Sequence, residues 1–398
     1  MRKKILIVVS IFLGMIILLN SSYAIIEKVQ DENIFQNTPA VIIEDKGIEN
    51  TEEETNEMSS GRVQNLVVEV LSGEKKGNKY NATYTVSARE DSTFKFDILK
   101  VGDKVYLTID ERMEEPLVYV SGIQRHTALV VLAIIFLLSI VIVGRKKGLK
   151  TIISLAITIA IVFFWALPRI INGASPLWIA ITVSSVITIV TYIIISGFNK
   201  KTVAAILGTL GGLLLSAIVV LIFGYVTRLS GLNEESMYLF FLPQGIKFDL
   251  VEIIFAGIII GALGACMDMA MSIASALEEI KKENPSAGKV TLFKAGMNIG
   301  KDVMGTNTNT LILAYVGSSL TILILYMAYG MSFSEIADVE VVAEAIIRSL
   351  AGSIGLIGVI PLTAFISSLL YSKNGEYEEY EEYEEYEEDE DELYEEEE

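Results

Sequence analysis

Cysteine and histidine are nearly absent from this chain, since each occurs once in 398 residues, as Cys266 and His126. One cysteine excludes an intrachain disulfide, and one histidine excludes a metal site with several histidine ligands. A Ser-His-Asp site would have to use His126. The sequence also contains no P-loop, so any energy for transport would have to come from an ion gradient.

Basic residues are missing from the last 24 residues, 375–398, which hold 17 of the 50 acids. Without this segment the net charge of −19 becomes −2. The acidity therefore belongs to a tail and not to the rest of the chain. Its Glu-Glu-Tyr repeat offers no apolar surface for a core, so we predict a disordered Glu/Tyr-rich tail at 375–398.

Apolar residues are abundant instead, at 52% of the chain. The first run, Ile5–Leu19, follows three basic residues and precedes Ser22 and Ala24 in a small-x-small pattern. This arrangement predicts a signal peptide over residues 1–24, with an uncleaved signal anchor as the alternative. In both cases the residues that follow are exported.

Residues 25–60 are polar and acidic, and we predict a linker with one short strand at Val41–Ile43. Over residues 61–125 apolar and polar residues alternate, as in Tyr80–Ala88, which predicts four or five strands. We expect a small extracytoplasmic all-β domain, a barrel or a sandwich. It is either a binding module for an envelope protein or a folded spacer. No aromatic or basic cluster marks it, and we expect no nucleic-acid partner.

Seven membrane-length apolar runs follow over residues 127–372. They are Thr127–Val143, Thr151–Leu167, Pro176–Gly197, Thr202–Phe223, Leu250–Ile273, Leu311–Met327 and Val342–Leu370. A span needs about 20 residues, which each run reaches or nearly reaches. The predicted fold class is therefore a polytopic α-helical membrane bundle of about seven spans in the lipid bilayer, preceded by the exported all-β domain.

Lys and Arg are unevenly distributed between the loops on the two sides of this bundle. Twelve lie on one side: Arg145, Lys146, Lys147, Lys150, Lys200, Lys201, Lys281, Lys282, Lys289, Lys294, Lys301 and Lys373. Three lie on the other: Arg169, Arg228 and Lys247. The positive-inside rule then places the acidic tail in the cytoplasm and the β-domain outside.

Span five carries small and polar residues on one helical face, and among them Asp268 is the only acid between Glu252 and Glu278. A carboxylate inside a span is costly and needs a partner or water. Gly257 and Gly261, spaced by four, allow another helix to approach closely. Asp268 is either part of an ion- or proton-linked site or an aspartate near the inner interface that orders the bundle.

The segment Phe293–Thr310 mixes Gly, Asn and Thr with apolar residues, which predicts an amphipathic or re-entrant segment running into span six. Together with span five it predicts one polar transport site, made of Asp268, Ser272, Ser275, Asn298, Asp302, Thr306 and Asn309. The alternative is that Asn and Thr only cap the start of the helix.

Span seven carries Glu344 and Arg348, an i,i+4 pair in the favourable order. We predict a structural ion group of these two with Glu252 from span five, against local snorkelling of Arg348 as the alternative. Three glycines before Pro361 predict a closely packed, kinked helix. The methionines that follow Cys266, at positions 267, 269 and 271, point in several directions on a helix. We therefore expect no metal and no cofactor.

Three stretches, Gly264–Ile273, Gly300–Thr306 and Asn309–Tyr315, resemble the YibE/F-like multipass membrane proteins of bacteria. The resemblance covers roughly residues 60–372 and excludes the acidic tail. Lys301 stands where the pattern has arginine. The resemblance implies an exported β-domain before a helical bundle, and it implies no substrate.

Two functions remain. The first is a permease or secondary transporter for a small ion or solute, which the carboxylate and the interrupted late spans favour. The second is a non-transporting scaffold or sensor whose β-domain binds an envelope partner. We expect no enzymatic activity, because aspartyl chemistry needs two carboxylates in reach and only Asp268 with Asp302 could supply them.

Overall fold

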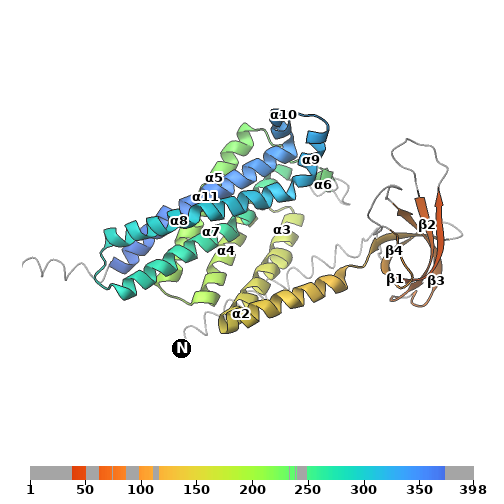
Figure 1. Ribbon diagram of the computed structural model, residues 1–398, viewed down its shortest axis with the longest axis horizontal. Coiled ribbons are helices and arrows are strands. Elements are labelled where there is room, and N and C mark those ends of the chain that lie inside the picture. Colours follow the sequence, from red (N-terminus) through yellow and green to blue (C-terminus); the bar gives the residue numbers. More distant parts are fainter. Residues whose placement is uncertain are drawn as a thin grey trace, which may run out of the picture. The chain divides into compact units, whose positions relative to one another are not determined.

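A computed structural model describes residues 38–50, 62–73, 75–86, 98–110, 116–232, 234–237, 239 and 249–372. The described residues divide into two compact units, one up to Ile142 and one from Val143 onward (Figure 1). The first holds the strands and the second most of the helices. The predicted signal segment at 1–24 and the tail at 375–398 lie outside the described residues.

The strands form a closed barrel with the order β1-β2-β3-β5-β4. Their bounds are β1 Thr38–Asn50, β2 Arg62–Val70, β3 Lys79–Val86, β4 Lys104–Asp110 and β5 Leu117–Ile123. All pairs are antiparallel except β3 with β5. This is the strand order of an OB-type barrel, and it settles the choice between barrel and sandwich.

Strand β1 lies inside the stretch 25–60 that we predicted as an acidic linker, so the β-domain begins at Thr38 and not at residue 61. Ala40 and Ile42 are buried in the barrel core, while the acids Glu44 and Glu49 point outward. Two register shifts bend β1, after Ile42 and after Asp45, and let one strand pair with both β2 and β4.

A buried polar side chain, Gln64, fixes the chain that enters β4. Its amide oxygen accepts from the Leu99 backbone N–H at 3.0 Å, and its amide nitrogen donates to the Leu99 carbonyl at 2.8 Å. The same nitrogen donates to Asp45 at 3.0 Å. The buried amide is therefore satisfied, as burial of a polar group requires.

The helices occupy the rest of the described chain. They are α2 His126–Ile161, the π-helix η2 Val162–Ala166, α3 Leu167–Ile171, α4 Pro176–Ser196, α5 Lys200–Val226, α6 Glu234–Met237, α7 Leu250–Glu283, α8 Lys289–Ser318, α9 Leu320–Ala328, α10 Phe333–Asp338 and α11 Glu340–Ser372. By length and composition five helical stretches are apolar enough to cross a membrane, or six if the bent pair α8–α9 counts as one.

Two of these stretches are interrupted. The first, His126–Ile171, contains a non-helical residue, Arg145, at φ 47° and ψ −124°. That break falls between the first two predicted spans. Helices α8 and α9 are bent by 60° where they meet at Ser319.

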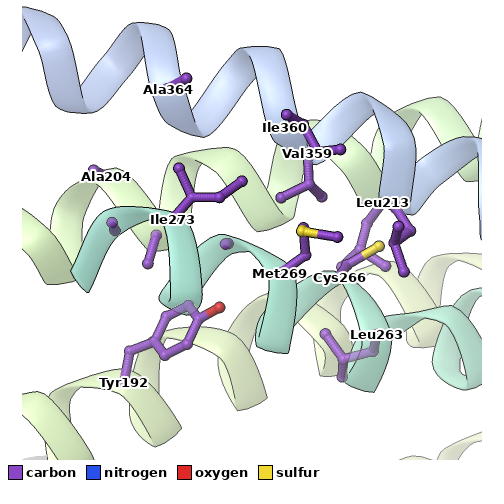
Figure 2. Packing of buried hydrophobic residues seen from close by; sticks show 14 of the residues in the cluster. Tyr192, Ala204, Leu213, Leu263, Cys266, Met269, Ile273, Val359, Ile360 and Ala364 are labelled. Carbon is purple, nitrogen blue, oxygen red and sulfur yellow. The ribbon is translucent and has the colours of Figure 1, made fainter. Parts of the chain in front are cut away.

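The core of the helical unit is built around α7, which packs against α4, α5, α8 and α11. Figure 2 shows Cys266, Met269 and Ile273 of α7 among side chains of the neighbouring helices. Leu292 of α8 is fully buried in the same cluster. One face of α7 is therefore committed to the core, which leaves the opposite face for other contacts.

Two sequence predictions concern helix shape. Residues Phe293–Thr310 were predicted as an amphipathic or re-entrant segment, and they lie in one continuous helix, α8 from Lys289 to Ser318, with one buried and one exposed side, as the amphipathic alternative requires. Two of its glycines, Gly296 and Gly300, lie against Ala364 and Ile360 of α11 and allow close packing without a break. Helix α11 is one helix that contains Pro361, and Gly352, Gly355 and Gly358 before it lie in close contact with neighbouring helices, as predicted.

Candidate functional site

Asp268 lies at the centre of the 34-residue helix α7. It is about 27 Å along the axis from Leu250, at 1.5 Å per residue. Its side chain is exposed and forms no hydrogen bond or ion pair with any residue that the structure describes. Gly261, Gly264 and Ser272, on the same helical side, are exposed as well. The predicted small and polar stripe is thus the face of α7 that points away from the core.

Helix α8 runs antiparallel to α7 and carries a second exposed polar face. Two contacts fix the level of one helix against the other. A Cβ built at Gly261 lies 2.6 Å from the Tyr315 hydroxyl, and one built at Gly296 lies 3.0 Å from Leu277. Since both helices rise equally per residue, Asp268 lies level with the turn that holds Thr306.

We call the exposed polar and small residues at these levels the Asp268 face. It consists of Gly264, Asp268 and Ser272 of α7 and Asp302, Gly305, Thr306 and Asn309 of α8. Five of the seven predicted site residues therefore lie on it. Of the other two, Asn298 is exposed one turn before Asp302, and Ser275 is half-buried. The structure thus aligns the predicted residues along two helices but records no direct bond between the two sets.

The oxygen atoms of this face suit a small hard cation or a proton. Two carboxylates (Asp268 and Asp302), the hydroxyls of Ser272 and Thr306 and the amide of Asn309 provide oxygen ligands of the kind that such ions take. Asp302 lies about one turn from Asp268 along the axis and on a different helix. Among the described residues no group of three His, Cys, Asp or Glu side chains is placed to hold a metal ion.

A buried polar contact behind Asp268 was missed by the sequence analysis. The Tyr192 hydroxyl of α4 donates to the Met267 carbonyl of α7 at 2.8 Å, and it lies 2.8 Å from the Thr209 hydroxyl of α5. Figure 2 shows this hydroxyl directed toward α7. The contact ties three helices together beside the carboxylate. A tyrosine within the apolar run of α4 was the available signal.

The predicted ion group forms only in part. Arg348 of α11 pairs with Glu344 of the same helix, as the i,i+4 spacing indicates. Arg348 reaches α7 beside Gly257 and lies over the Tyr315 ring at 5.8 Å. Glu252, however, accepts a hydrogen bond from Ser175 at 2.5 Å.

The assignment of Glu252 to the Arg348 ion group was therefore wrong. Ser175 caps the start of α4, which brings its hydroxyl to the Leu250 end of α7. The Ser175 hydroxyl is a hydrogen-bond donor, so the carboxylate of Glu252 has a partner there that is not a cation.

A cavity of about 310 Å³ lies elsewhere, between α8, α9, α10 and α11. Leu323, Met327, Phe333 and Ile346 are among its mostly apolar lining residues. The bend at Ser319 separates α9 from α11, and α10 closes one side. Beside it, the Ser332 backbone N–H and hydroxyl hold the pKa of Glu335 below its usual range. No residue of the Asp268 face lines this cavity.

Comparison with known proteins gives one match. The model of a family described as YibE/F-like protein matches residues 132–373. No curated protein and no solved structure matches the chain. The match covers the helical region, including every residue of the Asp268 face.

Proposed function

The chain belongs to the YibE/F-like family, and from that premise we propose that it is a multi-pass protein of the bacterial cell membrane. Seven spans result when the first apolar stretch is divided at Arg145 and the pair α8–α9 is counted as one. Residues 126–144 and 146–171 are each long enough to cross. The twelve-to-three distribution of Lys and Arg supports an orientation with the barrel outside and the tail in the cytoplasm.

We further propose that this protein is a permease or secondary transporter for a small ion or solute. The observation that carries the proposal is the exposed carboxylate of Asp268 at the centre of α7. A charged side chain at the middle of a span disfavours insertion by roughly 2.5–3.5 kcal/mol on translocon scales, and the penalty falls toward the interface. A residue with a purely structural role would be expected to have a bonding partner, and Asp268 has none among the described residues.

The chemistry of the face indicates the role of each group. Asp268 takes up and releases a proton or a cation, and charge on its carboxylate is balanced by that ion. Ser272, Thr306 and Asn309 supply neutral oxygen ligands near its level. Gly264 and Gly305 leave space beside the carboxylate, since nothing lies within 4 Å of a Cβ built at either. Transport of this kind needs no cofactor, no enzymatic step and no nucleic-acid partner.

Substitution of Asp268 tests the proposal. Asp268→Asn keeps the shape of the side chain but cannot titrate or supply charge, so activity in a deletion strain should be lost at normal membrane abundance. Asn309→Leu should have much the same effect, because leucine offers no ligand atom. Glu279→Gln is the matched control, since Glu279 is an exposed acid on α7 bonded only to nearby Lys282. A fully active Asp268→Asn protein would contradict transport through this site.

The second candidate is a scaffold or sensor whose barrel binds an envelope protein. The barrel favours it in one respect, because Tyr119 is 48% exposed on its outer surface beside the polar Thr83 and Thr108. Exposed aromatic side chains are enriched at protein interfaces. Under this function Tyr119→Ala would abolish activity and Asp268→Asn would not.

A further inference from the structure

We propose that the acidic tail, residues 375–398, binds lysine side chains at the end of the helical unit where helix α11 ends. These lysines are Lys200 at the start of α5 and Lys289 and Lys294 at the start of α8, and we call them the lysine cluster. The inference does not depend on transport, because it concerns charges that the packing of the helices brings together.

Two contacts place the lysine cluster beside the end of α11. The Lys200 Nζ lies 5.9 Å from the centre of the Tyr371 ring, and the Lys289 Nζ lies 5.7 Å from the centre of the Phe365 ring. Helix α11 ends at residue 372, directly after Tyr371. Lys294 follows Lys289 by about 7.5 Å along α8, at 1.5 Å per residue. The chain therefore leaves α11 beside cations of two neighbouring helices.

This end of the helical unit carries an excess of positive charge. The start of α5, the end of α7 and the start of α8 together hold six lysines and three acids: Lys200, Lys201, Lys281, Lys282, Lys289 and Lys294, against Glu278, Glu279 and Glu283. Like charges at this density repel one another, so a segment of opposite charge is favoured beside them.

The ion pairs at this end use other lysines. Glu278 lies 2.7 Å from Lys201. Glu279 lies 2.9 Å from Lys282. Among the residues that the structure describes, no carboxylate pairs with any member of the lysine cluster, and all three members are exposed. The cluster is therefore accessible to acids that arrive from elsewhere.

The tail supplies such acids at the right place. Residues 375–398 hold 17 acids and no base, and only Lys373 and Asn374 separate them from α11. A stretch of 24 residues can span up to about 80 Å, so its acids can reach every lysine of the cluster. Attachment to α11 keeps their local concentration on the order of millimolar. One exposed ion pair contributes little, but the tail can form several at once.

Anionic lipid headgroups are the competing partner for exposed lysines at a membrane surface. The tail is the occupant favoured here, because it is part of the same chain and begins beside the cluster. Its own negative charge also repels an anionic leaflet, which leaves the lysines as its nearest cations. A bilayer without anionic lipid separates the two sources.

Acetylation of lysine side chains tests the contact in the full chain. The protein is placed in nanodiscs of phosphatidylcholine at low salt and treated briefly with a water-soluble acetylating reagent, and mass spectrometry quantifies each modified lysine. The comparison is a full-length variant in which glutamine and asparagine replace the 17 tail acids. Lys200, Lys289 and Lys294 are expected to react severalfold more slowly in the unmodified protein than in this variant. Lys79, exposed on β3, is the control and should react equally in both.

Salt and a crosslinker complete the test. Near 1 M salt the screening length falls to about 3 Å, so the cluster should then react as fast in the unmodified protein as in the variant. A water-soluble carbodiimide should join tail carboxylates to the cluster in a product with the mass of one chain.

Equal reaction rates in the two proteins at low salt would overturn the proposal, and so would protection that appears only after anionic lipid is added. Crosslinks found only at the mass of two chains would assign the contact to the tail of a neighbouring copy and overturn it as well. If the variant fails to accumulate, rates in the unmodified protein that do not change with salt contradict the contact. The assay measures lysine exposure, so its failure would leave the transport proposal standing.

Discussion

Replacing Gly212 with alanine should weaken the contact between α5 and α11 and lower the stability of the bundle. A Cβ at this position would lie 2.3 Å from Val359 Cγ2 and 2.8 Å from the Gly355 carbonyl oxygen. The valine methyl can shift, but the carbonyl oxygen belongs to the helix backbone. The two helices must therefore separate to admit one methyl group.

The magnitude follows from two opposing effects. Overpacking of this kind destabilises by about 1–3 kcal/mol, and the backbone contact places Gly212 in the upper half of that range. Alanine gains about 0.8–1.0 kcal/mol over glycine as a helix former. The net loss is about 1–2 kcal/mol. For a unit of this size each kcal/mol lowers Tm by about 2–4 °C.

The single thiol of the chain provides the assay. Cys266 is fully buried in the helical core, so a maleimide dye that fluoresces on reaction reports opening of the bundle during heating. Gly317→Ala is the control, because its added methyl meets open space and should leave Tm unchanged or slightly raised. An unchanged or higher Tm for Gly212→Ala would refute the close approach of α5 and α11.

Three further predictions concern the core, the tail and the topology. Tyr192→Phe should destabilise the bundle by about 1–3 kcal/mol, because the Thr209 hydroxyl is left buried without its partner, and the same thiol assay measures the loss. Truncation after Lys373 should leave insertion and stability intact, since the acidic tail has no apolar surface to pack; absence of the truncated protein from membranes would count against this. Reporter enzymes fused after Lys147, Lys201 or Lys282 should be cytoplasmic and those after Ser230 or Ser334 external, and an external signal at Lys282 would exclude seven spans.

The positions of the long helices could be predicted from the sequence, because each helix coincides with a long run of apolar residues. The break at Arg145 separates the first two predicted spans, and the stripe on span five is the face that α7 turns away from the core. Strand β1 escaped prediction for a physical reason. Three of its exposed residues, Glu44, Asp45 and Glu49, are acids, so the stretch has the composition of a linker, and pairing with β2 and β4 makes it a strand.

The remaining errors concern contacts between distant residues, which spacing alone does not determine. Glu252 pairs with Ser175, 77 positions away, because α4 and α7 begin at the same end of the bundle. Gly, Asn and Thr in α8 left an amphipathic helix and a re-entrant segment open, and only the packing of Gly296 and Gly300 against α11 distinguishes them. The partner of Tyr192 on α7 is a backbone carbonyl, which no sequence pattern reports.

The most direct test of the central claim is chemical labelling of Asp268 in membrane vesicles. A membrane-permeant carbodiimide reacts with protonated carboxyl groups, and mass spectrometry of the α7 peptide quantifies the adduct. If Asp268 is an ion- or proton-linked site, labelling should fall as the pH rises, and sodium or potassium should protect it if either is the coupling ion. Asp268→Asn supplies the blank, and Glu279 on the same helix supplies the control carboxylate. An Asp268 that stays unlabelled at every pH, or is labelled equally at all pH values with and without these cations, would contradict the account.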